Sequence, residues 1–238
     1  MADAPQAKTF WKIRVLIVDD ETFVRRLVRR MISGLSVSEI VEAIDGQEAI
    51  KLLRKFKADI VICDNQMEPL GGLEFLKIIR SGGDPDIRRD LPIIMLTGDT
   101  DANVFATAMA LDVDAFVKKP IGKDAFAEKI QRCFDVPQLI RESSVYAGVN
   151  LVAEKEEIPG QVFDAETMVE KTFTELAVGD VVSMDLMSST GTLLLAAGMA
   201  ISATSIGRLQ DLEGMNEIKI IVVLKPEPEE TASDDDKG

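Results

Sequence analysis

The sequence predicts an α/β fold: a doubly wound, parallel five-stranded sheet of the (βα)5 type, followed by a small β-rich C-terminal module. Three observations lead to it. Short apolar runs alternate with longer amphipathic segments through residues 1–135. The apolar runs are nearly continuous, as in parallel strands that helices cover on both faces. The remaining residues are far more acidic and carry a different pattern of short strands.

The first domain consists of five expected strands and five expected helices in alternation. Each strand is rich in Ile and Val and is bounded by Asp, Gly or Pro, and we expect strands at 13–18, 40–43, 59–63, 92–96 and 114–117. Each helix carries apolar residues three or four positions apart, and we expect helices at 21–33, 47–57, 73–81, 101–111 and 123–134.

The C-terminal module is expected to hold two strands at 180–187 and 192–196, joined by a hairpin turn at 188–191. Ser202 is a suitable N-cap for a helix at 203–212, Gly214 would end that helix, and a last strand follows at 217–224. A unit of roughly fifty residues is near the size at which a core alone is marginal, so it would pack on the first domain or on a second copy.

The charge divides the chain in the same way. Residues 1–135 have a net charge of −2, whereas residues 136–238 have a net charge of −12. Pro-punctuated acidic runs at 154–160 and after 225 are typical of disordered segments. The expected divisions are an extension at 1–12, the first domain at 13–135, a linker at 136–173, the module at 174–224 and an acidic tail at 225–238.

The absence of histidine excludes several functions. A chain with no histidine has no Ser-His-Asp triad, no HExxH zinc site, no HD-type metal phosphohydrolase site and no histidine phosphoacceptor. Cys63 and Cys133 form no metal-ligand spacing or disulfide framework, and Cys63 is expected in the core. No apolar run is long enough to span a membrane, so a soluble, cytoplasmic protein is expected.

Polar residues collect at the carboxyl ends of the expected strands. Asp19 and Asp20 follow the first strand, Asp64 the third, Thr97 and Gly98 the fourth, and Lys118 and Lys119 the fifth. In such sheets the functional site lies outside these ends. Close carboxylates repel one another unless a cation is present, and Mg²⁺ is commonly held by a few carboxylates and water. A lysine and a hydroxyl facing that ion suit a phosphoryl group accepted by a carboxylate.

Four stretches, at 15–21, 59–64, 92–98 and 115–120, carry a family resemblance. With these motifs in order at strand ends, residues 13–134 resemble a CheY-like receiver domain of the two-component response regulators, which has a flavodoxin-like fold. The resemblance implies that Asp64 is the phosphoacceptor. It also implies Mg²⁺ (or Mn²⁺) bound directly by Asp20, Asp64 and the backbone carbonyl of Gln66, with Asp19 acting through water.

The resemblance assigns the remaining site residues as well. Thr97, with Gly98 beside it, would bind a phosphoryl oxygen and shift on activation, and Lys119 would pair with the phosphoryl group. Phe116 occupies the position of an aromatic switch. The Lys119–Pro120 bond is expected to be cis.

Each of these residues also has a structural interpretation. Asp19 and Asp20 could cap the following helix, Thr97 could be a turn residue and Lys119 a solvated charge, but the complete set favours the site. Phe116 could equally be a core aromatic. The loop after Asp64 departs from the common family form by a proline one place later, and the positions that modulate dephosphorylation are occupied by Gln66 and Asp99.

Residues 176–224 more weakly resemble a short module found beside HD-GYP phosphodiesterase domains, although the phosphodiesterase itself is excluded by the lack of histidine. The expected function is a response regulator that signals through phosphorylation-dependent protein–protein interaction and is not an enzyme beyond its own phosphorylation and dephosphorylation. The expected partners are a sensor histidine kinase or histidine phosphotransfer protein and an unidentified downstream protein.

A homodimer through the face of helix 4, strand 5 and helix 5 is a further expectation. Two alternatives stay open at this point. One is a DNA-binding regulator with a divergent output domain, against which the acidic charge argues. The other is an enzyme acting on a cyclic dinucleotide, for which the catalytic motifs are absent.

Overall fold

The computed structural model describes residues 12–35, 37–98, 102–119, 122–136, 140–151, 168–187, 193–195, 197–213 and 221–224. The expected hairpin turn, the acidic segment at 154–160 and the acidic tail lie outside these residues. Five strands alternate with five helices in the N-terminal domain. The strands are β1 (Ile13–Val18), β2 (Val37–Ala43), β3 (Ile60–Asp64), β4 (Ile93–Thr97) and β5 (Ala115–Lys118). The helices are α1 (Thr22–Ile32), α2 (Gly46–Leu53), α3 (Gly72–Ser81), α4 (Ala102–Ala110) and α5 (Lys123–Asp135).

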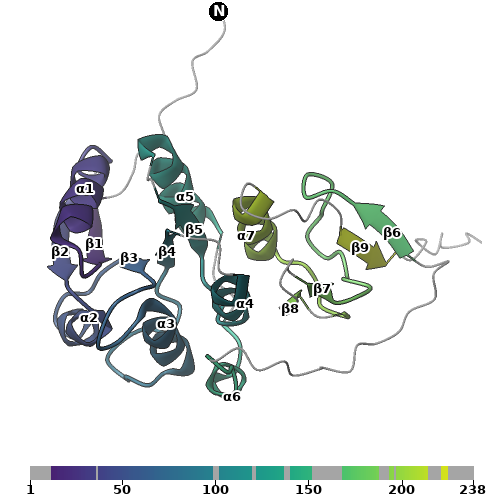
Figure 1. Cartoon of the computed structure of the whole chain (residues 1–238), viewed down its shortest axis with the longest axis horizontal. Coiled ribbons are helices and arrows are strands. Elements are labelled where there is room, and N and C mark those ends of the chain that lie inside the picture. Colours follow the sequence, from purple (N-terminus) through teal and green to yellow (C-terminus); the bar gives the residue numbers. More distant parts are fainter. Residues whose placement is uncertain are drawn as a thin grey trace, which may run out of the picture.

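The five strands form one parallel sheet in the order β2-β1-β3-β4-β5, which confirms the predicted fold class. Helices α1 and α5 pack together on one face, and α2, α3 and α4 lie on the other (Figure 1). Every residue of β3 and β4 is buried. Their uninterrupted apolar sequences are therefore explained by helices on both faces of the sheet.

The helix ends follow from local chemistry. The side chain of Asp45 accepts a hydrogen bond from the backbone N–H of Glu48 at 2.8 Å, which caps the start of α2. Helix α3 ends at Gly82, whose φ of 74° lies in the left-handed region that glycine adopts without strain.

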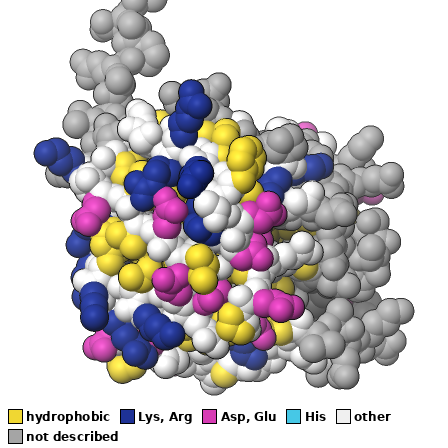
Figure 2. Space-filling view, turned by 60° about the vertical axis from the view of Figure 1, so that its left-hand side comes forward, with side chains coloured by type: hydrophobic (Ala, Val, Ile, Leu, Met, Phe, Trp, Pro, Cys, Tyr) yellow, Lys and Arg dark blue, Asp and Glu magenta, His cyan; other side chains and the backbone are white. Residues whose placement is uncertain are grey.

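The outer face that carries α1 and α2 mixes basic, acidic and hydrophobic side chains, and no one kind covers it (Figure 2). This mixture on the visible face agrees with the small net charge of the N-terminal domain.

The C-terminal part is β-rich, as predicted. Among the described residues its strands pair in two small antiparallel sheets, β6 with β9 and β7 with β8, and helix α7 lies between β8 and β9 in the sequence. The elements are α6 (Ser143–Ala147), β6 (Met168–Lys171), β7 (Leu186–Met187), β8 (Leu193–Leu195), α7 (Ala203–Glu213) and β9 (Ile221–Leu224). Ser202 accepts a hydrogen bond from the backbone N–H of Ser205 at 3.0 Å, so it caps α7 as expected.

The single strand expected at 180–187 is wrong. Only Leu186 and Met187 form a strand, while Val181 makes an isolated bridge to Ala200 and Val182 makes one to Val223. The segment fails to continue as one strand because its residues pair with three different partners in turn.

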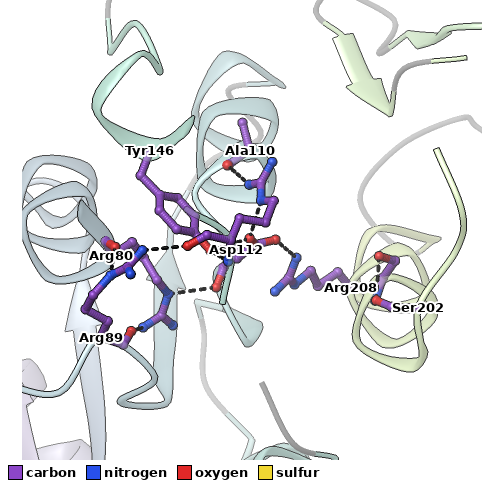
Figure 3. Close-up of polar contacts among 9 residues, drawn as sticks. Arg80, Arg89, Ala110, Asp112, Tyr146, Ser202 and Arg208 are labelled. Carbon is purple, nitrogen blue, oxygen red and sulfur yellow. Dashed lines mark hydrogen bonds and ion pairs between the residues drawn. The ribbon is translucent and has the colours of Figure 1, made fainter. Parts of the chain in front are cut away.

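Two elements fall within the stretch expected to be a linker. Strand β6 pairs with β9 and so belongs to the module. Helix α6 packs on α3, and its Tyr146 is fully buried. The hydroxyl of Tyr146 donates to a carboxylate oxygen of Asp112 at 2.8 Å (Figure 3), and the guanidinium of Arg141 lies over its ring. This segment is therefore fixed to the N-terminal domain.

The C-terminal module lies beside the β5 edge of the large sheet (Figure 1). Helix α7 contacts β5, and β8 contacts α4. Buried apolar residues of both parts, such as Phe105 in α4 and Leu209 in α7, belong to one continuous cluster. The module thus shares a core with the N-terminal domain instead of forming a separate one.

Candidate functional site

The predicted phosphoacceptor and its neighbour lie at the carboxyl ends of adjacent strands. Asp19 directly follows β1, and Asp64 is the last residue of β3. These two strands pair in the sheet, so the two carboxylates are brought to the same edge. Both side chains are almost wholly buried.

Lys119 joins the two carboxylates. It follows β5, and its ammonium nitrogen lies 2.9 Å from Oδ1 of Asp64 and 3.2 Å from Oδ2 of Asp19. The three residues predicted to act on a phosphoryl group are therefore in contact, although they come from three different strand ends. Lys118, the preceding residue, is exposed, which agrees with the choice of Lys119.

The pKa values in this cluster reflect burial and mutual charge. Burial raises the pKa of Asp19 and the charge of Asp64 adds to the rise, while the N–H of Glu21 and the Lys119 ammonium oppose it. Burial alone would lower the pKa of Lys119, but its hydrogen bond to Asp64 and the two negative charges outweigh burial and raise that pKa. The lysine therefore stays protonated and can bind an anionic group.

The other carboxylate oxygens are held by backbone donors. The N–H of Glu21 donates to Oδ1 of Asp19 at 2.8 Å, and the N–H of Gln66 donates to Oδ2 of Asp64 at 2.9 Å. These bonds fix both carboxylates in place and put the backbone of Gln66 beside the acceptor. The role of the Gln66 carbonyl as a metal ligand stays a prediction.

Asp20, Thr97 and Gly98 surround this cluster. Asp20 is exposed at the rim. Thr97 is buried at the end of β4, and its carbonyl oxygen accepts the N–H of Lys119 at 2.7 Å. A Cβ on Gly98 would lie 4.0 Å from the side chain of Lys119. Thr97 and Gly98 therefore lie beside the lysine, as predicted.

Phe116 lies in β5, three residues before Lys119. Its ring is buried and meets Phe105 of α4 edge-on, with ring centroids 4.8 Å apart. This is compatible with either the switch or the core interpretation.

Pro120 and Asp99 lie outside the described residues, so the expected cis bond at Pro120 stays a prediction. Among the described residues, the Glu68–Pro69 bond is the cis one.

Two residues that shape the site were not identified from the sequence. Gly72, at the start of α3, lies so close to the acceptor strand that a Cβ there would be 2.3 Å from the carbonyl oxygen of Asp64. Arg25 of α1 donates to the carbonyl oxygens of Asp19 and Asp20 at 2.7 and 3.1 Å. The one sequence signal for Arg25 is its position on the buried stripe of α1, where a cation needs a partner.

The site has the donor chemistry for a hard divalent cation. The carboxylates of Asp19 and Asp64 lie together at the carboxyl edge of the sheet, and the positively charged ammonium of Lys119 contacts both of them. In the part of the chain that the structure describes, no three acidic or sulfur ligands lie close enough together to hold a metal by themselves. A site of this kind suits Mg²⁺, which is usually held by one or two carboxylates and keeps several waters.

Known proteins resemble the N-terminal domain. The family model for the response regulator receiver domain matches residues 15–131. Chemotaxis protein CheY-3 of Vibrio cholerae is 30% identical over 123 residues, which are 52% of this chain and 92% of that protein. A protein-glutamate methylesterase/protein-glutamine glutaminase of Pyrococcus horikoshii is 33% identical over 143 residues, which are 55% of this chain and 37% of that protein.

Among solved structures, one to which the chain is similar is the chemotaxis response regulator CheY4 of Vibrio cholerae. It has a TM-score of 0.46 and 28% identity, and the match covers 52% of this chain and 99% of that one.

None of the helices among the described residues has the length and apolar character needed to cross a membrane.

Proposed function

The chain belongs to the family of response regulator receiver domains, and from that premise we propose that it accepts a phosphoryl group on Asp64. The observation that carries this proposal is the contact of the Lys119 ammonium with Asp64 and Asp19 at the carboxyl edge of the sheet. A carboxylate is a competent nucleophile when its neighbours orient it and stabilise the transferred charge.

The transfer proceeds as follows. One carboxylate oxygen of Asp64 attacks the phosphorus of a phosphohistidine on another protein, the P–N bond breaks, and the imidazole leaves with a proton. The phosphoryl group ends as an acyl phosphate on Asp64. Lys119 and the hydroxyl of Thr97 bind its oxygens. Asp20, Asp64 and the backbone carbonyl of Gln66 would hold Mg²⁺ (or Mn²⁺), with Asp19 acting through water, and the bound ion would neutralise the charge that develops on those oxygens.

The phosphoryl donor must be a separate protein, because this chain contains no histidine. We therefore propose a sensor histidine kinase or a histidine phosphotransfer protein as the donor and a downstream protein as the receiver of the signal. A cytoplasmic location is part of the proposal. The unpaired thiols of Cys63 and Cys133 support it.

The acidic module is proposed to take part in protein contacts and not in DNA binding or catalysis. Its basic side chains among the described residues, Lys171 and Arg208, are both engaged in ion pairs, with Asp180 and Asp112. Neither is available for a DNA phosphate. The similarity to a methylesterase covers 37% of that protein, so its activity is not assigned to this chain.

Labelling of the intact chain with acetyl phosphate and Mg²⁺ tests the proposal. We expect intact-mass measurements to show one added phosphoryl group on the wild type and none on Asp64→Asn. A matched control is Asp90→Asn, because Asp90 is an exposed carboxylate outside the site. EDTA should abolish the labelling. Equal labelling of Asp64→Asn and the wild type would contradict the assignment.

A further inference from the structure

Arg25 of α1 binds three successive carbonyl oxygens of the loop between β1 and α1. Its Nη1 donates to the carbonyl oxygen of Asp19 at 2.7 Å and to that of Asp20 at 3.1 Å. Its backbone N–H donates to the carbonyl oxygen of Glu21 at 3.1 Å. A single residue therefore holds the backbone that carries the two acidic residues at the end of β1.

The guanidinium of Arg25 is nearly buried, and each of its nitrogen atoms has a partner. The side chain is 11% exposed. Besides the two bonds of Nη1, Nη2 donates to the hydroxyl of Thr22 at 3.1 Å, and Nε donates to a carboxylate oxygen of Glu42 on β2 at 3.3 Å. Because a guanidinium presents its donors in one rigid plane, these partners together fix its position relative to the loop.

Glu42 is held in turn by a second arginine of α1. Nε of Arg29 lies 2.5 Å from the other carboxylate oxygen of Glu42, and Nη2 of Arg29 donates to the carbonyl oxygen of Ile40 at 3.0 Å. The hydrogen bond from Arg29 lowers the pKa of Glu42, while partial burial opposes this shift. The carboxylate therefore stays ionised at neutral pH and ties Arg25 to β2.

The hydrogen bonds of Arg25 limit where the carboxylate of Asp20 can lie. Asp20 stands between two planar peptide groups, and the carbonyl oxygen of each is bound by the same nitrogen atom of Arg25. With both peptide planes held, the two backbone torsions of Asp20 are fixed, and so is the direction of its Cβ. The Asp20 carboxylate is exposed and has no hydrogen-bond partner among the described residues, so its placement depends on this backbone.

Loss of these bonds would loosen the loop without unfolding the sheet. Asp20, Glu21 and Thr22 are exposed, so water can replace the donors that Arg25 supplies. The N–H of Asp19 stays bonded to the carbonyl oxygen of Ala43 at 3.2 Å, and β1 keeps its pairing with β2 and β3. The main consequence is therefore a loop that no longer holds the carboxylate of Asp20 in one place.

We propose that Arg25 is a positioning residue for the divalent cation: it holds the loop in the form in which Asp20 ligates the ion, and Glu42 acts through Arg25. The inference rests on the proposed metal site of Asp20 and Asp64, and it requires no contact between Arg25 and the ion. Groups that orient the ligands of a metal without touching it commonly change its affinity by about tenfold or more when they are removed.

Binding of Mn²⁺ to the full-length chain tests the inference, with the free ion measured by electron paramagnetic resonance. Arg25→Lys keeps the positive charge and the apolar stem, but one ammonium cannot reach the two carbonyl oxygens, Thr22 and Glu42 together. We expect this variant to raise the dissociation constant of Mn²⁺ about tenfold. Arg26→Lys is the matched control, because Arg26 is the exposed neighbour on α1, and it should bind Mn²⁺ as the wild type does.

The outcomes separate positioning from folding. Equal dissociation constants of Arg25→Lys and the wild type would overturn the inference. So would fewer binding sites at an unchanged dissociation constant, which is the result of partial unfolding. In labelling by acetyl phosphate, Arg25→Lys should need about tenfold more Mg²⁺ for half-maximal rate and should approach the wild-type rate at saturating Mg²⁺. A wild type that binds Mn²⁺ and is not labelled on Asp64 would contradict the phosphoacceptor assignment and leave the inference intact.

A double-mutant cycle tests the part played by Glu42. Glu42→Gln removes the charge that holds Nε of Arg25, and we expect it to weaken Mn²⁺ binding about threefold, as the loss of a partly exposed ion pair does. Because Glu42 acts through Arg25, the double variant should bind Mn²⁺ no more weakly than Arg25→Lys alone. Glu39→Gln, at an exposed position on the same strand, is the control and should bind as the wild type does. Additive losses in the double variant would overturn the action of Glu42 through Arg25.

Discussion

The receiver and the C-terminal module bury their strands to different extents. In the receiver, β3 and β4 are buried along their whole length and pair on both sides within a five-stranded sheet. In the part of the module that the structure describes there are two sheets of two strands each, and these strands are two to four residues long. Isolated two-stranded sheets are marginally stable. We infer that the receiver stabilises itself, while the module depends on the core that it shares with α4 and β5.

The largest expected effect is a loss of stability in the receiver, the region that we infer to be stable by itself. Arg80 of α3 is fully buried, and its Nη2 lies 2.8 Å from Asp114 in the loop before β5. Arg80→Ala removes the ion-pair partner of the buried Asp114 carboxylate and leaves it with the backbone N–H of Ile93 as donor, so we expect the free energy of unfolding of the receiver to fall by about 3–5 kcal/mol in urea denaturation. Arg88→Ala, at an exposed pair with Asp90, should change it by about 0.5 kcal/mol or less.

A slightly smaller loss of stability is expected in the C-terminal module, which depends on the shared core. Leu209 of α7 is buried in the shared core. Leu209→Ala should lower the stability of the docked module by about 2–4 kcal/mol, because it removes buried methyl groups and leaves a cavity. We expect faster proteolysis and hydrogen exchange in 168–213 while the receiver strands keep their protection. Gln210→Ala, at an exposed neighbour, should change neither. An equal loss of protection in β3 would show that the two regions unfold as one.

An intermediate effect is expected at Gly72 in the receiver, where a substitution should change both stability and phosphorylation. In Gly72→Ala the new Cβ would overlap the carbonyl oxygen of Asp64, so the end of β3 must shift. We expect a loss of about 1–3 kcal/mol in stability and a fall of about tenfold or more in labelling by acetyl phosphate, since misplacement of reacting groups is costly. Gly122→Ala is the control, because a Cβ there would meet nothing within 4 Å. Normal labelling of Gly72→Ala would show that the loop adapts.

The smallest expected effect lies where the two regions meet. Tyr146→Phe removes the hydroxyl that bonds to Asp112 and to the N–H of Arg141 but keeps the ring under the two guanidinium groups. We expect a loss of about 1 kcal/mol in the free energy of unfolding. Tyr146→Leu, which also loses the cation–π contacts, should lose more. Equal losses in the two variants would show that the hydroxyl alone accounts for the effect.

The receiver was predictable because its signals are local. Apolar strands and amphipathic helices fix the (βα)5 order, and the position of Asp19, Asp64 and Lys119 directly after strands fixes where they meet. Strand β1 has the predicted bounds, whereas at least one end of each of the other four strands differs from the prediction by one to three residues, since tertiary pairing also sets where a strand begins: β2, for example, starts at Val37 rather than at residue 40.

The features that were not predicted depend on contacts between residues far apart in the sequence. Helix α6 has only five residues and is held by Tyr146, whose partner Asp112 is 34 positions away. Arg208 and Asp211 read as ordinary charges on an amphipathic helix, because their partners lie 79 to 96 positions earlier in the sequence. Gly72 gives no signal in a single sequence, since its role is defined by the space that it leaves to Asp64.

The partly buried charges of Asp112, Lys129 and Arg132 also limit how this protein can be rebuilt. They pair with Arg208 and Asp211 of α7. A receiver grafted in from another protein would face the buried side chains of Arg208 and Asp211 with whatever residues it carries at those three places, and each mismatch would leave one of these two charges without its partner. A working chimera must therefore carry all three residues along with the receiver, or exchange α7 together with it.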